Sequence, residues 1–168
     1  LYDLCYYKII KAEELAGKYE ELALLTKIFF WKRKLALAIS GNRKDIPSLL
    51  VKEKETIEQM NVLNTYWQHT INISNLINDD NFLRELTETK WNIAYPLQSM
   101  VLHCHILYSL HFIKGHIKEA EKHISNLIMH LEKYPDRIKE DPYSYVTAIG
   151  NKIGLYLSGK RWNEIPAL

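Results

Sequence analysis

The sequence predicts an all-α protein built from antiparallel helical hairpins. Only 6 glycines and 5 prolines occur in 168 residues, which favours long helices over short strands joined by tight turns. Residues 97–114 are apolar nearly all round, as in a helix buried between neighbours. Residues 117–134 carry one apolar stripe, formed by Ile117, Ala120, Ile124, Leu127, Ile128 and Leu131. We expect these two helices to fold back on each other about Gly115.

Two further helices are predicted before this central hairpin, and each ends at a glycine. Residues 1–16 carry apolar side chains at helical spacing and stop at Gly17, a residue type favoured in the left-handed conformation that closes helices. Residues 19–40 are apolar on two sides and stop at Gly41. This second helix should therefore be contacted from two directions.

A long helix is predicted after the polar turn at residues 42–44. Asp45 is a suitable N-cap, and Pro47 is tolerated in a first turn whose N–H groups have no helical partner to lose. The helix should reach residue 77 and could bend at a patch rich in Asn and Thr. Its apolar stripe consists of Ile46, Leu50, Ile57, Met60, Trp67 and Ile71. A loop at residues 78–81, a short helix to residue 89 and a connector over residues 91–96 follow.

The C-terminal part is predicted to add another helix to the stack. Pro135 closes the helix before it, and Asp141 with Pro142 supplies an N-cap and a proline at the first helical position. Its stripe is Tyr145, Ile149, Ile153 and Tyr156, and it ends at Gly159. A last helix begins near Trp162 and is cut off by the chain end, and the chain begins without methionine. We therefore expect residues 1–168 to form a single domain that is a fragment of a longer protein.

Composition narrows the classes of protein. A quarter of the residues are charged, but the formal net charge is only +2, which argues against disorder and against a strongly polyanionic partner. Cys5 and Cys104 are too few for a disulfide framework, so we expect a reducing, cytoplasmic location with both thiols as small core residues. The most apolar run, residues 28–39, is interrupted by three cations and is shorter than the ~20 residues of a membrane span.

The chain contains an internal repeat. Four turns, at Gly17, Gly41, Gly115 and Gly159, share a helix end, a glycine, a polar residue and a new helix start, as in stacked helical hairpins. The turns at Gly17 and Gly115 resemble those of tetratricopeptide repeats (TPRs), which read glycine, polar, aromatic, two acidic or polar residues, then alanine. The matching residues are Tyr19, Glu20 and Glu21 in the first turn and Lys118, Glu119 and Ala120 in the other. Leu22 replaces the alanine of the first turn, and Ile117 replaces the aromatic residue of the other.

The whole pattern resembles the TPR-like helical regions of bacterial proteins, best over residues 97–168 and least in the long helix. This resemblance implies an α-α superhelix that binds proteins or peptides, with no enzymatic activity and no cofactor. If the binding surface of the repeat carries over, it is lined here by His105, Ser109 and Phe112. The competing function is a sensory or regulatory helical region of a transcription regulator or kinase whose output domain is absent.

Metal-binding and catalytic chemistry are not expected. Two ligands on one helix reach the same ion at a spacing of three or four residues, whereas His116, His123 and His130 are seven apart. Cys104 lies on the predicted buried arm, where an apolar setting raises the pKa of a thiol and leaves it inert. No nucleophile elbow, zinc-protease helix or phosphate-binding loop occurs in the sequence.

A nucleic-acid interface is the remaining alternative, and we do not favour it. Lys32, Arg33 and Lys34 follow two phenylalanines and a tryptophan, which is a basic and aromatic combination used in nucleic-acid binding. Helical geometry spreads three consecutive cations to three sides, where their aliphatic stems can cover apolar neighbours. We therefore expect these cations to act as surface residues of a helix.

Overall fold

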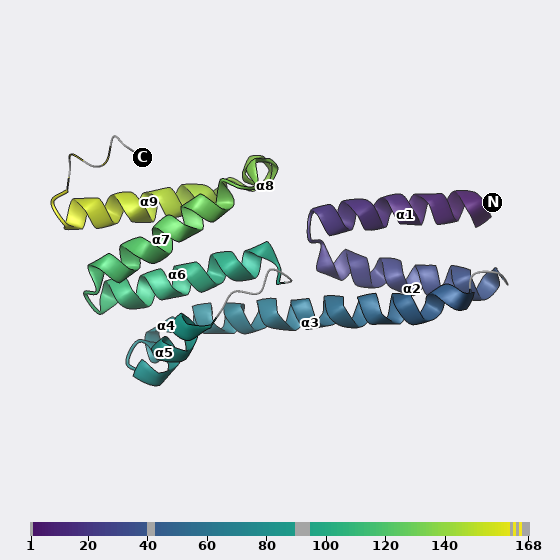
Figure 1. The fold of residues 1–168 in the computed structure, drawn as a ribbon, viewed down its shortest axis with the longest axis horizontal. Coiled ribbons are helices and arrows are strands. Elements are labelled where there is room, and N and C mark those ends of the chain that lie inside the picture. Colours follow the sequence, from purple (N-terminus) through teal and green to yellow (C-terminus); the bar gives the residue numbers. More distant parts are fainter. Residues whose placement is uncertain (1, 40–42, 90–94, 162, 164, 166–168) are drawn as a thin grey trace. The chain divides into compact units, whose positions relative to one another are not determined.

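The computed structural model of this protein describes all residues except 1, 40–42, 90–94, 162, 164 and 166–168 (Figure 1). Within the described residues every regular element is a helix and none is a strand, which confirms the all-α prediction. The chain divides into two compact units, Leu1–Asn64 with Ala94–Pro96 and Thr65–Ile93 with Leu97–Leu168. The predicted helix end at Gly41 and the helix start near Trp162 lie outside the described residues.

The first unit contains two antiparallel helices and most of a third. Helix α1 (Tyr2–Lys18) turns back into α2 (Leu22–Ala38), and a short 3-10 turn, η1 (Arg43–Asp45), leads into α3 (Ile46–Ile71) (Figure 1). The core of this unit consists of Ala16, Leu22, Leu25, Ile28, Phe29 and Leu49. Side chains from all three helices therefore meet in one apolar cluster.

The apolar stripe that predicted α3 is not the face that the helix buries. Leu50 and Ile57 are 50% and 47% exposed, whereas Leu49 and Thr56 are buried. The residues one position earlier in the sequence thus face the first unit's core. A 3.6-residue period predicts that a helix forms, but two neighbouring stripes can share this period, and packing selects between them.

Three helix ends share one hydrogen-bond pattern, but glycine occupies its left-handed position only once. The N–H groups of Glu21, His116 and Arg161 each donate to the carbonyl oxygen five residues earlier, at 2.8 Å in every case. The residue before each donor has a positive φ, which is 53° at Glu20, 77° at Gly115 and 56° at Lys160. This arrangement is the Schellman motif. The left-handed cap predicted at Gly17 is wrong, because α1 continues through Gly17 to Lys18 and Glu20 takes the left-handed conformation.

Placing glycine at the strained position after α9 (Tyr143–Ser158) should stabilise the second unit. Lys160 has a side chain in a conformation that glycine adopts without steric cost. We expect Lys160→Gly to raise the free energy of unfolding by about 0.5–1 kcal/mol, after allowing for the greater freedom of glycine in the unfolded chain. Lys122→Gly, in the interior of a helix, should instead lose about 1 kcal/mol. Urea denaturation compares the free energies of unfolding of the two variants. Equal losses in both would contradict a strained left-handed conformation at Lys160.

The second unit begins within the last part of α3, at Thr65. The helix predicted to reach residue 77 stops at Ile71, and the Nδ2 of Asn72 donates to the carbonyl oxygen of Gln68 at 3.0 Å. A single turn, α4 (Ile73–Leu76), and a short helix, α5 (Asp80–Glu88), follow. Asp79 caps α5 by accepting the Phe82 N–H at 2.9 Å. The bend predicted at the Asn- and Thr-rich patch is therefore a complete helix break.

A stack of three long helices forms the core of the second unit. Helices α6 (Leu97–Ile113), α7 (Ile117–Leu131) and α9 run antiparallel to their neighbours in the stack (Figure 1). The predicted stripe on α7 is buried, with Ala120, Ile124 and Leu127 fully inaccessible. The fold-back about Gly115 is thereby confirmed, as is the burial of most of α6.

Two details of the C-terminal part differ from the prediction. Pro135 does not only follow a helix, because it also begins α8 (Pro135–Glu140), where its missing N–H costs nothing. Asp141 accepts the N–H of Tyr143 at 3.1 Å, as expected of a capping side chain, although the residue directly before α9 is Pro142. In α9, however, the most buried side chains are Ala148 and Leu155, and the predicted Ile149 and Ile153 are half-buried.

Candidate functional site

The first unit contains a groove of about 500 Å³ between α1, α2 and α3. Its apolar lining comes from Ile10, Leu25 and Phe29, and the last two belong to the unit's buried core. Its charged lining consists of Glu13, Glu14, Lys52 and Glu55, and Gly17, Thr56 and Gln59 complete it. Volumes of roughly 300–1,000 Å³ with apolar walls and a few polar groups are typical of ligand sites. We therefore treat this groove as the candidate functional site.

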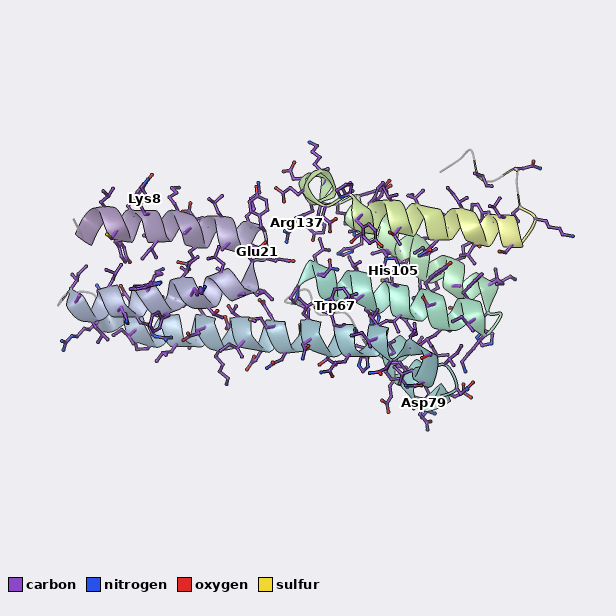
Figure 2. All side chains as sticks on the ribbon, turned by 180° about the vertical axis from the view of Figure 1, so that it is seen from behind. Lys8, Glu21, Trp67, Asp79, His105 and Arg137 are labelled. Atoms are coloured by element: carbon purple, nitrogen blue, oxygen red, sulfur yellow. The ribbon has the colours of Figure 1, made fainter. Side chains whose placement is uncertain are left out.

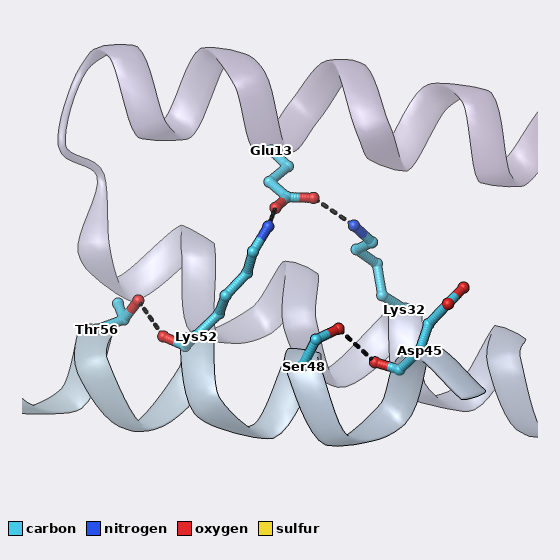
Figure 3. A network of polar contacts seen from close by, with 6 residues as sticks. All are labelled: Glu13, Lys32, Asp45, Ser48, Lys52 and Thr56. Carbon is cyan, nitrogen blue, oxygen red and sulfur yellow. Dashed lines mark hydrogen bonds and ion pairs between the residues drawn. The ribbon is translucent and has the colours of Figure 1, made fainter. Parts of the chain in front are cut away.

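A charge network at Glu13 joins the three helices around the groove (Figure 3). One carboxylate oxygen of Glu13 accepts a hydrogen bond from Lys32 of α2, and the other accepts from Lys52 of α3 at 3.0 Å. Burial alone would raise the pKa of Glu13, but the hydrogen bonds and charges of these two lysines outweigh it and lower the pKa below its ordinary value. Glu13 is therefore ionised at neutral pH and holds the three helices together.

The two remaining carboxylates of the groove face solvent. Glu14 pairs only with exposed Lys11, at 2.7 Å, which is the kind of surface contact that contributes little. Glu55 lies one helical turn along α3 from Lys52 and is also exposed. Thr56 is buried, and its hydroxyl donates to the carbonyl oxygen of Lys52 at 2.9 Å. The groove thus combines an apolar floor with a predominantly acidic rim.

The predicted binding residues lie in the other unit, on α6. His105, Ser109 and Phe112 are each half-buried, and Figure 2 labels His105 among the side chains of this helix. Burial lowers the pKa of His105. Phe112 stacks on Tyr108, with ring centroids 5.8 Å apart, and packs against the hairpin core. None of the three lines the groove of the first unit, and their role in binding stays a prediction.

The two cysteines have different environments. Cys104 is buried, and burial raises the pKa of its thiol to about 12, which agrees with the expected inert core residue. Cys5 is exposed on α1, so the expectation that it fills a core is wrong. Apolar periodicity near a chain end does not say which face of a helix finds a partner, and α1 buries a different face.

The basic segment of α2 spreads its cations as predicted. Lys32 pairs with Glu13, and Arg33 pairs with Glu53 of α3. Lys34 lies over the ring of Phe30 at 4.8 Å and that of Trp31 at 5.3 Å. Two of the three cations are therefore neutralised within the first unit, and the third covers aromatic surface.

Histidines gather on α6 and α7 in the second unit. The Nδ1 atoms of His111 and His116 are 3.5 Å apart, and the rings of His111 and His123 stack at 5.3 Å. His103 is buried and its Nδ1 lies 3.3 Å from the Tyr66 hydroxyl. Among the described residues, no group of three or more His, Cys, Asp or Glu side chains is arranged to hold a metal ion.

Comparisons with known proteins add no assignment: no protein-family model, curated protein or solved structure matches this chain. In the part of the chain that the structure describes, no helix is both long enough and apolar enough to cross a membrane.

The sequence contains little signal for the groove, because Glu13 is 19 residues from Lys32 and 39 from Lys52. Only the packing of the helices brings these charges together.

Proposed function

We propose that this protein is a non-enzymatic, cytoplasmic scaffold that binds a protein or peptide through stacked helical hairpins. The pairing of α1 with α2, of α6 with α7 and of α7 with α9 supports this proposal, because each pair consists of helices that follow closely along the chain. In this proposal the hairpins are TPR-like units of an α-α superhelix with long helices.

The observation that carries the proposal is the groove of the first unit. Leu25 and Phe29 offer an apolar floor for one large side chain of a ligand. Glu13 is already neutralised by two lysines, so Glu14 and Glu55 are the carboxylates that a cationic group of the ligand would meet. The groove therefore fits a peptide in which a large apolar residue lies next to lysine or arginine.

A library of random heptapeptides, displayed on phage and selected against the whole chain, tests the groove. We expect selected peptides to contain a large apolar residue beside a lysine or arginine. In fluorescence anisotropy, the double variant Glu14→Lys/Glu55→Lys should bind a selected peptide at least about tenfold more weakly, because two attractions become repulsions.

Glu58→Lys supplies the matched control for this experiment. Glu58 is exposed on the same helix but does not line the groove, and its partner Lys54 is an exposed residue 3.8 Å away. Binding by this variant should stay within about twofold of the unmodified protein. Selected peptides without basic residues, or equal affinities of the two charge-reversal variants, would contradict the groove assignment.

A sensory or regulatory region is the second candidate function. The feature that favours it is the group of histidines on and between α6 and α7, of which His103 and His111 are buried, because histidine is the side chain that titrates near neutral pH. A region that senses acid needs a group whose charge changes as the pH falls, and the described part of the first unit has no histidine.

A further inference from the structure

All seven histidines of the chain lie between residues 69 and 130, and three of them form a cluster at one end of the α6–α7 hairpin. His111 belongs to α6, His116 precedes the first residue of α7, and His123 lies two turns into α7. The rings of His111 and His123 are nearly parallel, with an interplanar angle of 7° and centroids 5.3 Å apart. We call these three residues the histidine cluster.

Hydrogen bonding makes the cluster sensitive to its protonation state. The Nδ1 atoms of His111 and His116, 3.5 Å apart, can form a hydrogen bond only if one ring donates and the other accepts. Protonation of both rings turns both atoms into donors. The favourable contact then becomes a repulsion between two cations, at a point where the two helices meet.

His116 is exposed, but the burial of His111 and the partial burial of His123 deprive these two rings of other ways to accommodate a charge. His111 is 7% exposed, and the Nε2 atoms of His111 and His123 are buried without a hydrogen-bond partner. A second proton on either ring would place an N–H donor with no acceptor in this setting, which is costly in a protein interior. A neutral ring carries a single N–H and can leave Nε2 without a hydrogen, whereas a protonated ring carries an N–H on both nitrogens, so its Nε2 is always a donor.

The charged groups near the cluster are two lysines, Lys114 and Lys122, and two carboxylates, Glu119 and Asp80, of which Asp80 acts on His116. The groups that act on His111 are His116, Glu119, Lys114 and Lys122, and those that act on His123 are His111, Lys122, His103 and Glu119. From α5, Asp80 faces this group and pairs with Lys114 at 2.5 Å. From α3, Tyr66 contributes its hydroxyl to His103. Glu119 is thus the one anion that acts directly on His111 and His123 in the interactions described, and it is exposed.

These surroundings fix the direction of the pH response. Burial, and then the charges of His111, Lys122 and His103, lower the pKa of His123 to about 4, and burial lowers the pKa of His103 to about 4. Burial and His116 also lower the pKa of His111. In an opened hairpin these rings return toward 6.5, so the open form binds more protons between pH 6.5 and about 4. Hairpin stability is therefore greatest above pH 6.5 and falls on acidification.

We propose that the histidine cluster is an acid-sensitive latch, which holds α6 against α7 at neutral pH and opens the hairpin when its imidazoles become doubly protonated. Opening would expose the apolar stripe of α7, including Ile124 and Leu127, which are both fully buried in the closed form. The first unit responds differently, because Leu1–Asn64 holds no histidine and the lowered pKa of Glu13 keeps its charge network ionised.

Amide hydrogen exchange on the full chain tests the latch, with rates corrected for the intrinsic effect of pH. Between pH 7.5 and pH 4.5 we expect protection within α6 and α7 to fall at least tenfold, while protection within α1 and α2 changes by less than threefold. In His111→Phe/His123→Phe, which keeps two stacked rings but removes their protons, the loss in α6 and α7 should shrink below threefold. His130→Gln, further along α7, should respond like the unmodified protein.

A second measurement covers the case in which the double variant fails to fold. Histidine resonances of the unmodified protein, followed by NMR, should show His111 and His123 titrating below pH 6.5 together with the exchange of α6 and α7 amides. Ordinary titration near pH 6.5 without loss of protection would overturn the proposal. A double variant that stays as acid-sensitive as the unmodified protein would overturn it too.

Discussion

Replacing Ala120 with lysine is expected to unfold the α6–α7 hairpin. Ala120 is 0% exposed and belongs to the apolar core shared by α6, α7 and α9. Overpacking such a site costs about 1–3 kcal/mol, and an unpaired buried ammonium adds several kcal/mol. The total approaches the whole stability of an ordinary domain, which is about 5–15 kcal/mol. Thermal denaturation followed by circular dichroism should show the second unit's transition at least ~15 °C lower, or lost.

The same substitution on the outer side of α7 provides the control. Asn126 is exposed on this helix, so Asn126→Lys should change the Tm by no more than about 3 °C. If Ala120→Lys were as stable as Asn126→Lys, residue 120 could not lie in the core, and the fold-back of the central hairpin would be wrong. A loss confined to Ala120→Lys would support the packing of α7 described above.

Removing the Glu13 carboxylate should destabilise the first unit by about 2 kcal/mol, because two lysines would lose their common partner. The side chain of Lys32 is only 12% exposed, so without Glu13 its ammonium group would be poorly solvated. The side chain of Lys52 is 53% exposed and would remain solvated. We therefore attribute most of the loss to Lys32. Urea denaturation of Glu13→Ala at pH 7, compared with the unmodified chain, measures the effect.

The variant Glu14→Ala and a pH series distinguish the loss of the Glu13 ion pairs from the loss of any single negative charge on α1. Glu14 is adjacent in sequence but pairs only with exposed Lys11, so its removal should cost less than about 0.5 kcal/mol. The pKa of Glu13 is lowered in the folded state, so its contribution is present above the unfolded value of 4.5 and is lost as the pH falls through the folded value. The deficit of Glu13→Ala should accordingly be full at pH 7 and shrink well below pH 4.5. A deficit that is the same at pH 3 and pH 7 would contradict the ion network.

Local features of the fold were predictable from neighbouring residues. The α6–α7 fold-back needed only Gly115, whose φ of 77° suits glycine, and the stripe that contains Ala120. The cap of α9 needed only Asp141. The left-handed residue of the first turn was misplaced because Glu20 adopts a conformation that the sequence favours at Gly17. The hydrogen bond from the Glu21 N–H to the Ala16 carbonyl oxygen fixes the left-handed conformation at residue 20, and the preference of glycine for that conformation does not decide its place.

The candidate site was less predictable than the fold. The groove depends on Glu13 of α1 and Lys52 of α3, which are 39 residues apart and lie on helices that α2 separates along the chain. The histidines were visible as a seven-residue repeat on α7, but the stacking of His123 on His111 of α6 was not. Their function in acid follows from burial and from missing partners, which are properties of the packed hairpin.

The amino-acid sequence by itself determined that this chain is helical and where most helices begin and end, because periodicity, caps and glycine act over a few neighbouring residues. Tertiary structure decided which face of α3 is buried, which lysines share Glu13, and which imidazoles stack. The physical reason is that a helix carries several stripes of side chains. The free energy that decides which stripe is buried comes from packing that stripe against another helix. The order of neighbouring residues along the chain does not specify it.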